Sequence, residues 1–227
     1  MEMIELQTIL CLQVETPSGE HGDPADYLLN GRAEIIGRTY DAAFAIRLGF
    51  VDFTLIRVTL ACEDGADLFT IFDQSQDLMD LREALYDPIF ADFTAEVQQA
   101  FPESFGHEDI LLFRDIEVLP FARGQRVGLS ALHRVARDWD GGCSLMGIDP
   151  RTRHPSNAES MDSDQGNEKL LHHFRGLGFR KVGDSPFLLR SPKLRQIPVA
   201  ELDVRNSVFL PKAMLDECGP DPQTSPP

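Results

Sequence analysis

The chain has 227 residues, 42% of them hydrophobic and 26% charged, a composition typical of a soluble globular protein with one sizeable core. Its formal net charge of -16 argues against a general nucleic-acid binder, because phosphate backbones bind to basic surfaces. No stretch reaches the roughly 18 uncharged apolar residues of a membrane span, and the N-terminus is acidic where a signal peptide is basic. We therefore expect a cytoplasmic protein that has neither nucleic-acid nor membrane partners.

The first 62 residues read mainly as strands. The segments IELQTILCLQV (4–14) and FVDFTLIRVTLA (50–61) contain apolar or alternating runs rich in β-branched and aromatic residues. Weaker strand candidates lie between them at 30–39 and 42–49. The turn formers of ETPSGEHGDP separate the first strand from the rest.

Residues 66–101 show apolar residues at helical spacing, in two segments divided at Pro88. The first segment carries Phe69, Phe72, Leu78, Leu81 and Leu85, and the second carries Ile89, Phe90, Phe93, Val97 and Phe101. Such faces usually pack in a core, so we infer no acyl pocket from them.

The second half of the chain alternates between strands and helices. In order it predicts a loop at 102–109, a strand at 110–119, a helix ending at Gly141, a buried strand at 143–149, a mobile polar loop at 150–166, a helix at 167–179 and a strand at 185–191. The end, 217–227, is expected to be disordered. This alternation predicts a mixed α/β fold, with at least one parallel strand pair joined by a right-handed crossover.

The charge is unevenly distributed. Residues 1–120 hold 6 Lys and Arg against 24 Asp and Glu, a net charge of -18, whereas residues 121–200 hold 13 against 8, a net charge of +5. The basic surplus begins at Arg123, directly after the strand at 110–119. A small anion is therefore most easily held where that strand passes into the following helix.

The stretch Arg123-Gly124-Gln125-Arg126-Val127-Gly128 lies at this junction. Unpaired N–H groups and the positive end of the helix dipole favour phosphate there. Glycine permits close backbone approach, and arginine supplies forked donors for phosphate oxygens. Taken alone, the pattern fits an ordinary tight turn as well as it fits a diphosphate site.

Other sites find little support in the sequence. The nucleotide-binding patterns G-x-x-x-x-G-K-[ST] and G-x-G-x-x-G after a strand are both absent. The four cysteines form no C-x-x-C pair, and the adjacent His172 and His173 diverge by about 100° on a helix. We therefore expect no metal site.

Residues 118–128 read VLPFARGQRVG, and residues 167–179 read NEKLLHHFRGLGF. Together these two motifs resemble the GNAT superfamily of acyl-CoA-dependent N-acetyltransferases. The first is similar to that family's acyl-CoA pyrophosphate loop, V-x-P-x-x-R-G-x-G-x-G, and the second to its late signature, N-x-x-A-x-x-x-Y-x-x-x-G-F. The resemblance covers about residues 109–191 and implies a central mixed β-sheet flanked by helices, with acetyl-CoA as the acyl donor.

The resemblance also implies roles for individual residues. Backbone groups of Ile116, Glu117 and Val118 would pair with the pantetheine arm as an added strand does, and a strand-end amide would polarise the thioester carbonyl. Amides of 123–128 would hold the pyrophosphate, with added charge from Arg123 and Arg126. Asn167 occupies the position that contacts the pantetheine arm.

This sequence departs from the family pattern at two positions. Arg126 replaces the central loop glycine, so either this position does not need a positive φ or the loop is remodelled. Phe174 replaces the frequent tyrosine that protonates the departing CoA thiolate, and phenylalanine has no proton to donate.

An amine acceptor needs a base, because amines are mostly protonated at neutral pH. Glu117 is the first candidate, directly or through water, and Asp115 shares its strand face. Either residue is equally compatible with a solvated or salt-bridged strand acid. His107, Glu108 and Asp109 are weaker candidates. The acidic N-terminal half fits a cationic acceptor, although solubility also explains its charge.

These observations predict a single domain over 1–200 and a C-terminal extension over 201–227. Within the domain, 1–108 would form the divergent acceptor side and 109–191 the acyl-CoA-binding core. The predicted activity is acetyl transfer to a primary amine on a small molecule or peptide, by direct attack in a ternary complex. The alternative is a catalytically inactive module that binds acyl-CoA or a protein partner. Dimerisation through a C-terminal strand in AELDVRNSVFL (200–210) is compatible with either.

Overall fold

The computed structural model describes residues 3–15, 22–41, 43–89, 92–139, 141–150, 163–193 and 207–212, without the side chains of 163–167 and 169. These residues form one sheet in the order β6-β7-β5-β4-β3-β2-β1-β8. The β4–β5 pair is parallel and the other pairs are antiparallel, so the sheet is mixed. The strands are β1 (Met3–Glu15), β2 (Leu28–Arg38), β3 (Ala45–Ile56), β4 (Asp109–Val118), β5 (Cys143–Ile148), β6 (Arg180–Lys181), β7 (Leu188–Arg190) and β8 (Ser207–Pro211).

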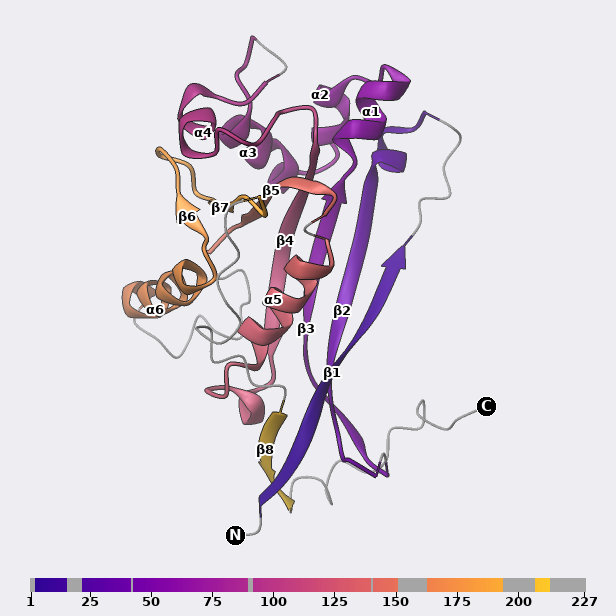
Figure 1. Ribbon diagram of the computed structural model, residues 1–227, viewed down its shortest axis with the longest axis vertical. Coiled ribbons are helices and arrows are strands. Elements are labelled where there is room, and N and C mark those ends of the chain that lie inside the picture. The colour runs from indigo at the N-terminus through magenta and orange to yellow at the C-terminus, as the bar shows by residue number, and fades with distance from the viewer. Residues whose placement is uncertain are drawn as a thin grey trace.

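Helices flank this sheet in two groups. Four short helices gather at one end of the sheet, while α5 lies across a face of it and α6 lies beside β6 and β7 (Figure 1). In the described part of the chain, no helix is both long and apolar enough to cross a membrane. The helices are α1 (Val58–Asp64), α2 (Leu68–Phe72), α3 (Gln76–Leu85), α4 (Ala95–Ala100), α5 (Val127–Asp138) and α6 (Ser163–Gly176), with 3-10 turns η1 (Pro24–Tyr27) and η2 (Pro120–Ala122).

Two hydrophobic clusters follow from this arrangement. The first packs α5 and the end of α6 against the sheet and extends to Leu6 of β1 and to Val208 and Leu210 of β8, all fully buried. The second packs the four short helices around the other end of the sheet. Because the lower part of β1 crosses in front of β2, β8 reaches the side of the sheet on which α5 begins (Figure 1).

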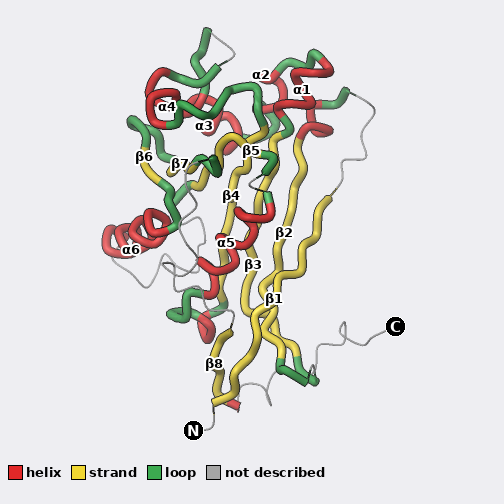
Figure 2. The backbone as a smooth tube through the Cα atoms, in the orientation of Figure 1, coloured by secondary structure: helices red, strands yellow, loops and turns green. Residues whose placement is uncertain are grey.

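The mixed α/β fold predicted from the sequence is confirmed, with an eight-stranded mixed sheet flanked by helices among the described residues. The predicted strands at 4–14, 110–119 and 143–149 correspond to β1, β4 and β5, and α5 joins β4 to its parallel neighbour β5. Figure 2 shows this alternation of strand and helix along the tube.

The segment 42–61 was predicted to form two strands, and the structure differs. Residues 45–56 form the single strand β3, which runs through Gly49, and helix α1 starts at Val58. A side chain at Gly49 would place its Cβ 2.0 Å from the Glu117 carbonyl oxygen, so this glycine allows a close strand approach rather than ending a strand.

The helical segment 66–101 also differs from its prediction. It forms α2, α3 and α4, because Ser75 and Thr94 cap new helices by accepting hydrogen bonds from Leu78 and Val97 amides. Phe69 of α2 is consequently 45% exposed rather than part of the predicted buried face.

Two further elements depart from the predicted boundaries. Helix α6 begins at Ser163, four residues before the expected start, and most of the expected loop 150–166 lies outside the described residues. The stretch 200–210 contributes β8, which pairs with β1 of the same chain. The expected disordered end, 217–227, lies outside the described residues.

Candidate functional site

Strand β4 loses its β5 neighbour halfway along its length. The register runs from Asp109 opposite Cys143 to Phe113 opposite Ile148, where β5 ends. The remaining residues of β4, 114–118, pair with β3 alone among the described strands. The edge of β4 that faces β5 therefore lacks a described strand partner just before the loop that leads to α5.

A β-bulge marks the same point in β4. Asp115 lies opposite Asp52 and Phe113 lies opposite Phe53, so Arg114 is the extra residue between them. Beyond the bulge, Ile116 and Val118 pack against the cluster that contains α5. Because side chains alternate along a strand, Asp115 and Glu117 share the opposite face, as the sequence predicts.

The backbone N–H and C=O groups of successive β4 residues point alternately to β3 and to the β5 side. The Glu117 carbonyl points toward β3, since it lies against Gly49, and the Leu119 N–H donates to the Leu48 carbonyl of β3 over 2.8 Å. The backbone groups of Ile116 and Val118 are therefore directed to the β5 side. These are the groups that a ligand extended along this edge would meet.

Arg123 folds back onto that edge from the loop. Its Nε donates to the Val118 carbonyl oxygen over 2.8 Å, and the side chain is otherwise exposed. The bond ties the loop to the end of β4. It also places a guanidinium cation between the strand edge and the start of α5.

The loop itself turns through two left-handed residues. Gly124 has a φ of 78° and Arg126 has a φ of 59°, and Arg126 is the one non-glycine residue with positive φ in the described ranges. The sequence left two alternatives for position 126: that it needs no positive φ, or that the loop is remodelled. Arg126 has a positive φ, so the first alternative is wrong.

Helix α5 starts close to β4 and without a side-chain cap. Arg126 is the N-cap residue and makes no side-chain cap hydrogen bond. An added Cβ at Gly128 would lie 2.8 Å from Val118 Cγ2, so glycine lets the first turn approach the strand. The first amides of α5, beginning at Val127, have no partner one turn earlier within the helix. This is the arrangement that binds phosphate.

Gln125 joins the loop to the C-terminal strand. Its Nε2 donates to the Phe209 carbonyl over 3.0 Å, and its Oε1 accepts from the Phe209 N–H over 2.8 Å. The side chain of Gln125 therefore points to β8, while its backbone remains part of the predicted pyrophosphate loop.

The face that carries Asp115 and Glu117 also holds a cluster that the sequence does not reveal. Arg32 of β2 binds Asp52 with both Nε and Nη2, at 2.6 and 2.7 Å, and its guanidinium lies 4.2 Å from the centre of the Phe50 ring. The hydrogen bond with Asp52 raises the pKa of Arg32, and the charge of Asp115 adds to this rise. Cross-strand partners come from distant sequence positions, so no local pattern predicts them.

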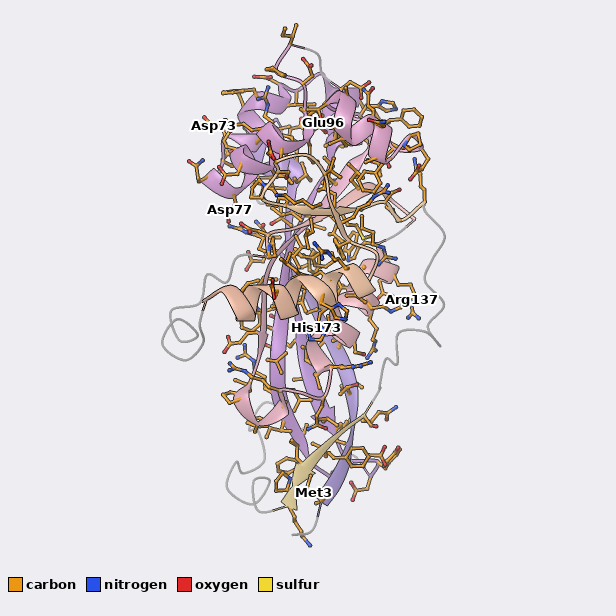
Figure 3. The ribbon with its side chains drawn as sticks, turned by 90° about the vertical axis from the view of Figure 1, so that its left-hand side faces the viewer. Met3, Asp73, Asp77, Glu96, Arg137 and His173 are labelled. Atoms are coloured by element: carbon orange, nitrogen blue, oxygen red, sulfur yellow. The ribbon has the colours of Figure 1, made fainter. Side chains whose placement is uncertain are left out.

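The two candidate site residues of the late signature, Asn167 and Phe174, both lie on α6. Phe174 of α6 is 3% exposed and packs edge-on against Phe179, with ring centroids 6.4 Å apart. Asn167 belongs to α6, but its side chain lies outside the described residues. Figure 3 shows α6 from its exposed side, with His173 labelled on it.

The weaker candidates have structural partners. The Glu108 carboxylate binds Lys193 Nζ at 2.6 and 2.8 Å, and Asp109 Oδ1 accepts from the Thr59 amide at 2.8 Å. The His107 ring stacks on Phe105. In the described part of the chain, no three His, Cys, Asp or Glu side chains gather as metal ligands do, and Cys11, Cys62 and Cys143 form no disulfide bonds.

Comparison with known proteins gives a distant likeness to a solved structure. No family model matches the sequence, and no curated protein matches it. A similar solved structure is that of a tyrosine-to-phenylalanine mutant of KacT, with a TM-score of 0.41 and 11% sequence identity, covering 82% of this chain and 96% of that chain. A TM-score below 0.5 is too low to identify a family.

Proposed function

We propose that the protein is an N-acetyltransferase that moves the acetyl group of acetyl-CoA to a primary amine. The observation that carries the proposal is the end of the β4–β5 pairing at Phe113, directly before the loop of 119–126 and the uncapped start of α5. A strand edge beside an anion-binding helix start suits the two parts of CoA, since the pantetheine arm pairs as a strand does and the diphosphate is an anion.

The donor side of the site uses β4 and the loop. The backbone groups of Ile116 and Val118 hold the pantetheine arm, and amides of 123–128 hold the diphosphate. Pairing at Val118 exchanges the present Arg123 bond for one to the ligand. The guanidinium is then available to the phosphate oxygens, with which arginine forms strong charge-assisted hydrogen bonds.

The acceptor side uses the opposite face of β4. Glu117 removes a proton from the ammonium group, directly or through water, and the free amine attacks the thioester carbonyl carbon. The new C–N bond forms as the C–S bond breaks, and the nitrogen loses its second proton to water. The CoA thiolate takes a proton from water, because Phe174 has none to give. Arg32 neutralises Asp52, so the attraction of this face for a cation comes from Asp115 and Glu117.

The second candidate function is a module that binds acyl-CoA, or a protein partner, without transfer. Phe174 favours it, because phenylalanine has no proton to donate at the position where the family places an acid, and its ring packs in the core instead. The two functions share the donor side of the site and differ in turnover.

A thiol-release assay separates them. Acetyl-CoA is incubated with the wild type and a panel of primary amines and amine-bearing peptides, and free CoA is measured against time. We expect amine-dependent release that falls by about 100-fold or more in Glu117→Gln, the usual contribution of a general base. The affinity for CoA should stay the same. Glu15→Gln, an exposed carboxylate at the end of β1, is the matched control. CoA binding without release by the wild type, across the whole panel, would favour the binding module.

A further inference from the structure

The link between the loop and the C-terminal strand is a paired contact. Gln125 uses both atoms of its side-chain amide, as donor and as acceptor, on the two backbone groups of the single residue Phe209. Two neighbouring strands exchange bonds in this way. The Gln125 side chain thus takes the place of a next strand along β8.

Strand β8 is held firmly on its other side. It pairs antiparallel with β1, with Phe209 opposite Glu5, and both Phe209 backbone groups point away from β1 toward Gln125. Val208 and Leu210, on either side, are fully buried in the cluster that also contains Val127 of α5. The strand is therefore a rigid support for the loop.

The loop is also held from within, where the Ala122 and Arg123 amides donate to the Leu119 and Pro120 carbonyls. Gly124 and Arg126 flank Gln125 and are both left-handed, a conformation that costs a non-glycine residue roughly 1–2 kcal/mol. Arg123 contributes one bond, to the Val118 carbonyl, and that bond lies on the edge proposed for the ligand. The Gln125 pair lies on β8, away from that edge, so it can remain when CoA is bound.

We propose that Gln125 is a positioning residue, which holds the loop in its CoA-binding shape by fastening it to β8. This inference rests on the proposed function, because the ligand in question is CoA. It couples the C-terminal strand to the donor site. Because coupling between two sites is reciprocal, CoA binding should also slow amide exchange in β8, even without contact between β8 and the ligand.

Hydrogen exchange and calorimetry on the full chain test the proposal. We compare the wild type, Gln125→Ala, Gln125→Glu and the control Gln13→Ala, an exposed glutamine of β1. Without ligand, the amides of 119–128 should exchange faster in both Gln125 variants. Gln125→Glu keeps the size of the side chain and the acceptor oxygen but loses the donor to the Phe209 carbonyl. It should therefore also weaken the restraint on the loop. The CoA dissociation constant should rise about threefold to tenfold, the value of one or two hydrogen bonds.

A coupling measurement distinguishes positioning from general stability. In the wild type, CoA should slow exchange in 207–211, whereas in Gln125→Ala it should slow exchange only in the loop. Equal loop exchange in the wild type and Gln125→Ala overturns the inference, as does equal CoA affinity in the two. A wild type that does not bind CoA overturns the proposed function instead, and the positioning role for CoA with it.

Discussion

Arg126 holds a conformation that its side chain disfavours, at the point where the loop enters α5. Its φ is 59°, a left-handed conformation that glycine adopts freely and that costs a residue with a β-carbon steric strain. We expect Arg126→Gly to unfold with a free energy about 1 kcal/mol larger than that of Arg126→Ala, because both variants lose the guanidinium and only alanine keeps the β-carbon. Urea unfolding of the two variants measures this difference.

The sign of that difference is what tests the conformation. In an ordinary helical position alanine is the more stable of the pair by roughly 0.5–1 kcal/mol. Alanine more stable than glycine at 126 would therefore show that the residue does not adopt a positive φ in solution.

Single residues of the site were predictable to the extent that they lie in one stretch of chain. The sequence placed Arg123 and Gly128 at the junction of strand and helix, and the resemblance gave the backbone of 123–128 its expected role. The shared face of Asp115 and Glu117 follows from strand alternation. The Arg32–Asp52 pair was not predicted, because β2 and β3 must be in register before its members meet. The side-chain role of Gln125 depends on β8, which is 84 residues away.

At the level of elements, the approach of α5 to β4 depends on Gly128. A methyl group there would lie 2.8 Å from Val118 Cγ2, so helix and strand must separate or a side chain must shift. We expect Gly128→Ala to lower the unfolding free energy by about 1–3 kcal/mol, as overpacking does, and to weaken CoA binding. Thermal unfolding and calorimetry measure the two effects.

The matched control for this change is Gly142→Ala, which lies after α5. No heavy atom lies within 4 Å of an added Cβ at Gly142, so this change should leave both stability and affinity within error of the wild type. Equal effects at 128 and 142 would contradict the close approach of α5 to β4.

Elements were predictable where their periodicity is long and uninterrupted. The strands β1, β4 and β5 and the helix α5 agree with prediction to within a few residues. The wrongly predicted boundaries lie at a glycine and at a capping residue, whose structural roles depend on tertiary packing. Gly49 marks close contact inside β3 rather than a strand end, and Ser75 begins a new helix inside a continuous apolar period.

For the whole molecule, the charge distribution is consistent with the proposed anion site. The chain carries a net charge of -16, yet the loop and the helices after it belong to a segment, 121–200, with a net charge of +5. The face of β4 that carries Asp115 and Glu117 also holds the Arg32–Asp52 ion pair. In the proposed function, β4 separates the site of the anionic donor from that of the cationic acceptor.

The measurement that tests the central claim most directly is calorimetric titration of the full chain with CoA, for the wild type and Arg123→Ala. We predict one site per chain with a dissociation constant in the micromolar range, weakened about tenfold or more in the variant as a charge-assisted phosphate contact is lost. No binding by the wild type, or equal binding by the two proteins, would contradict the claim that the loop between β4 and α5 is an acyl-CoA site.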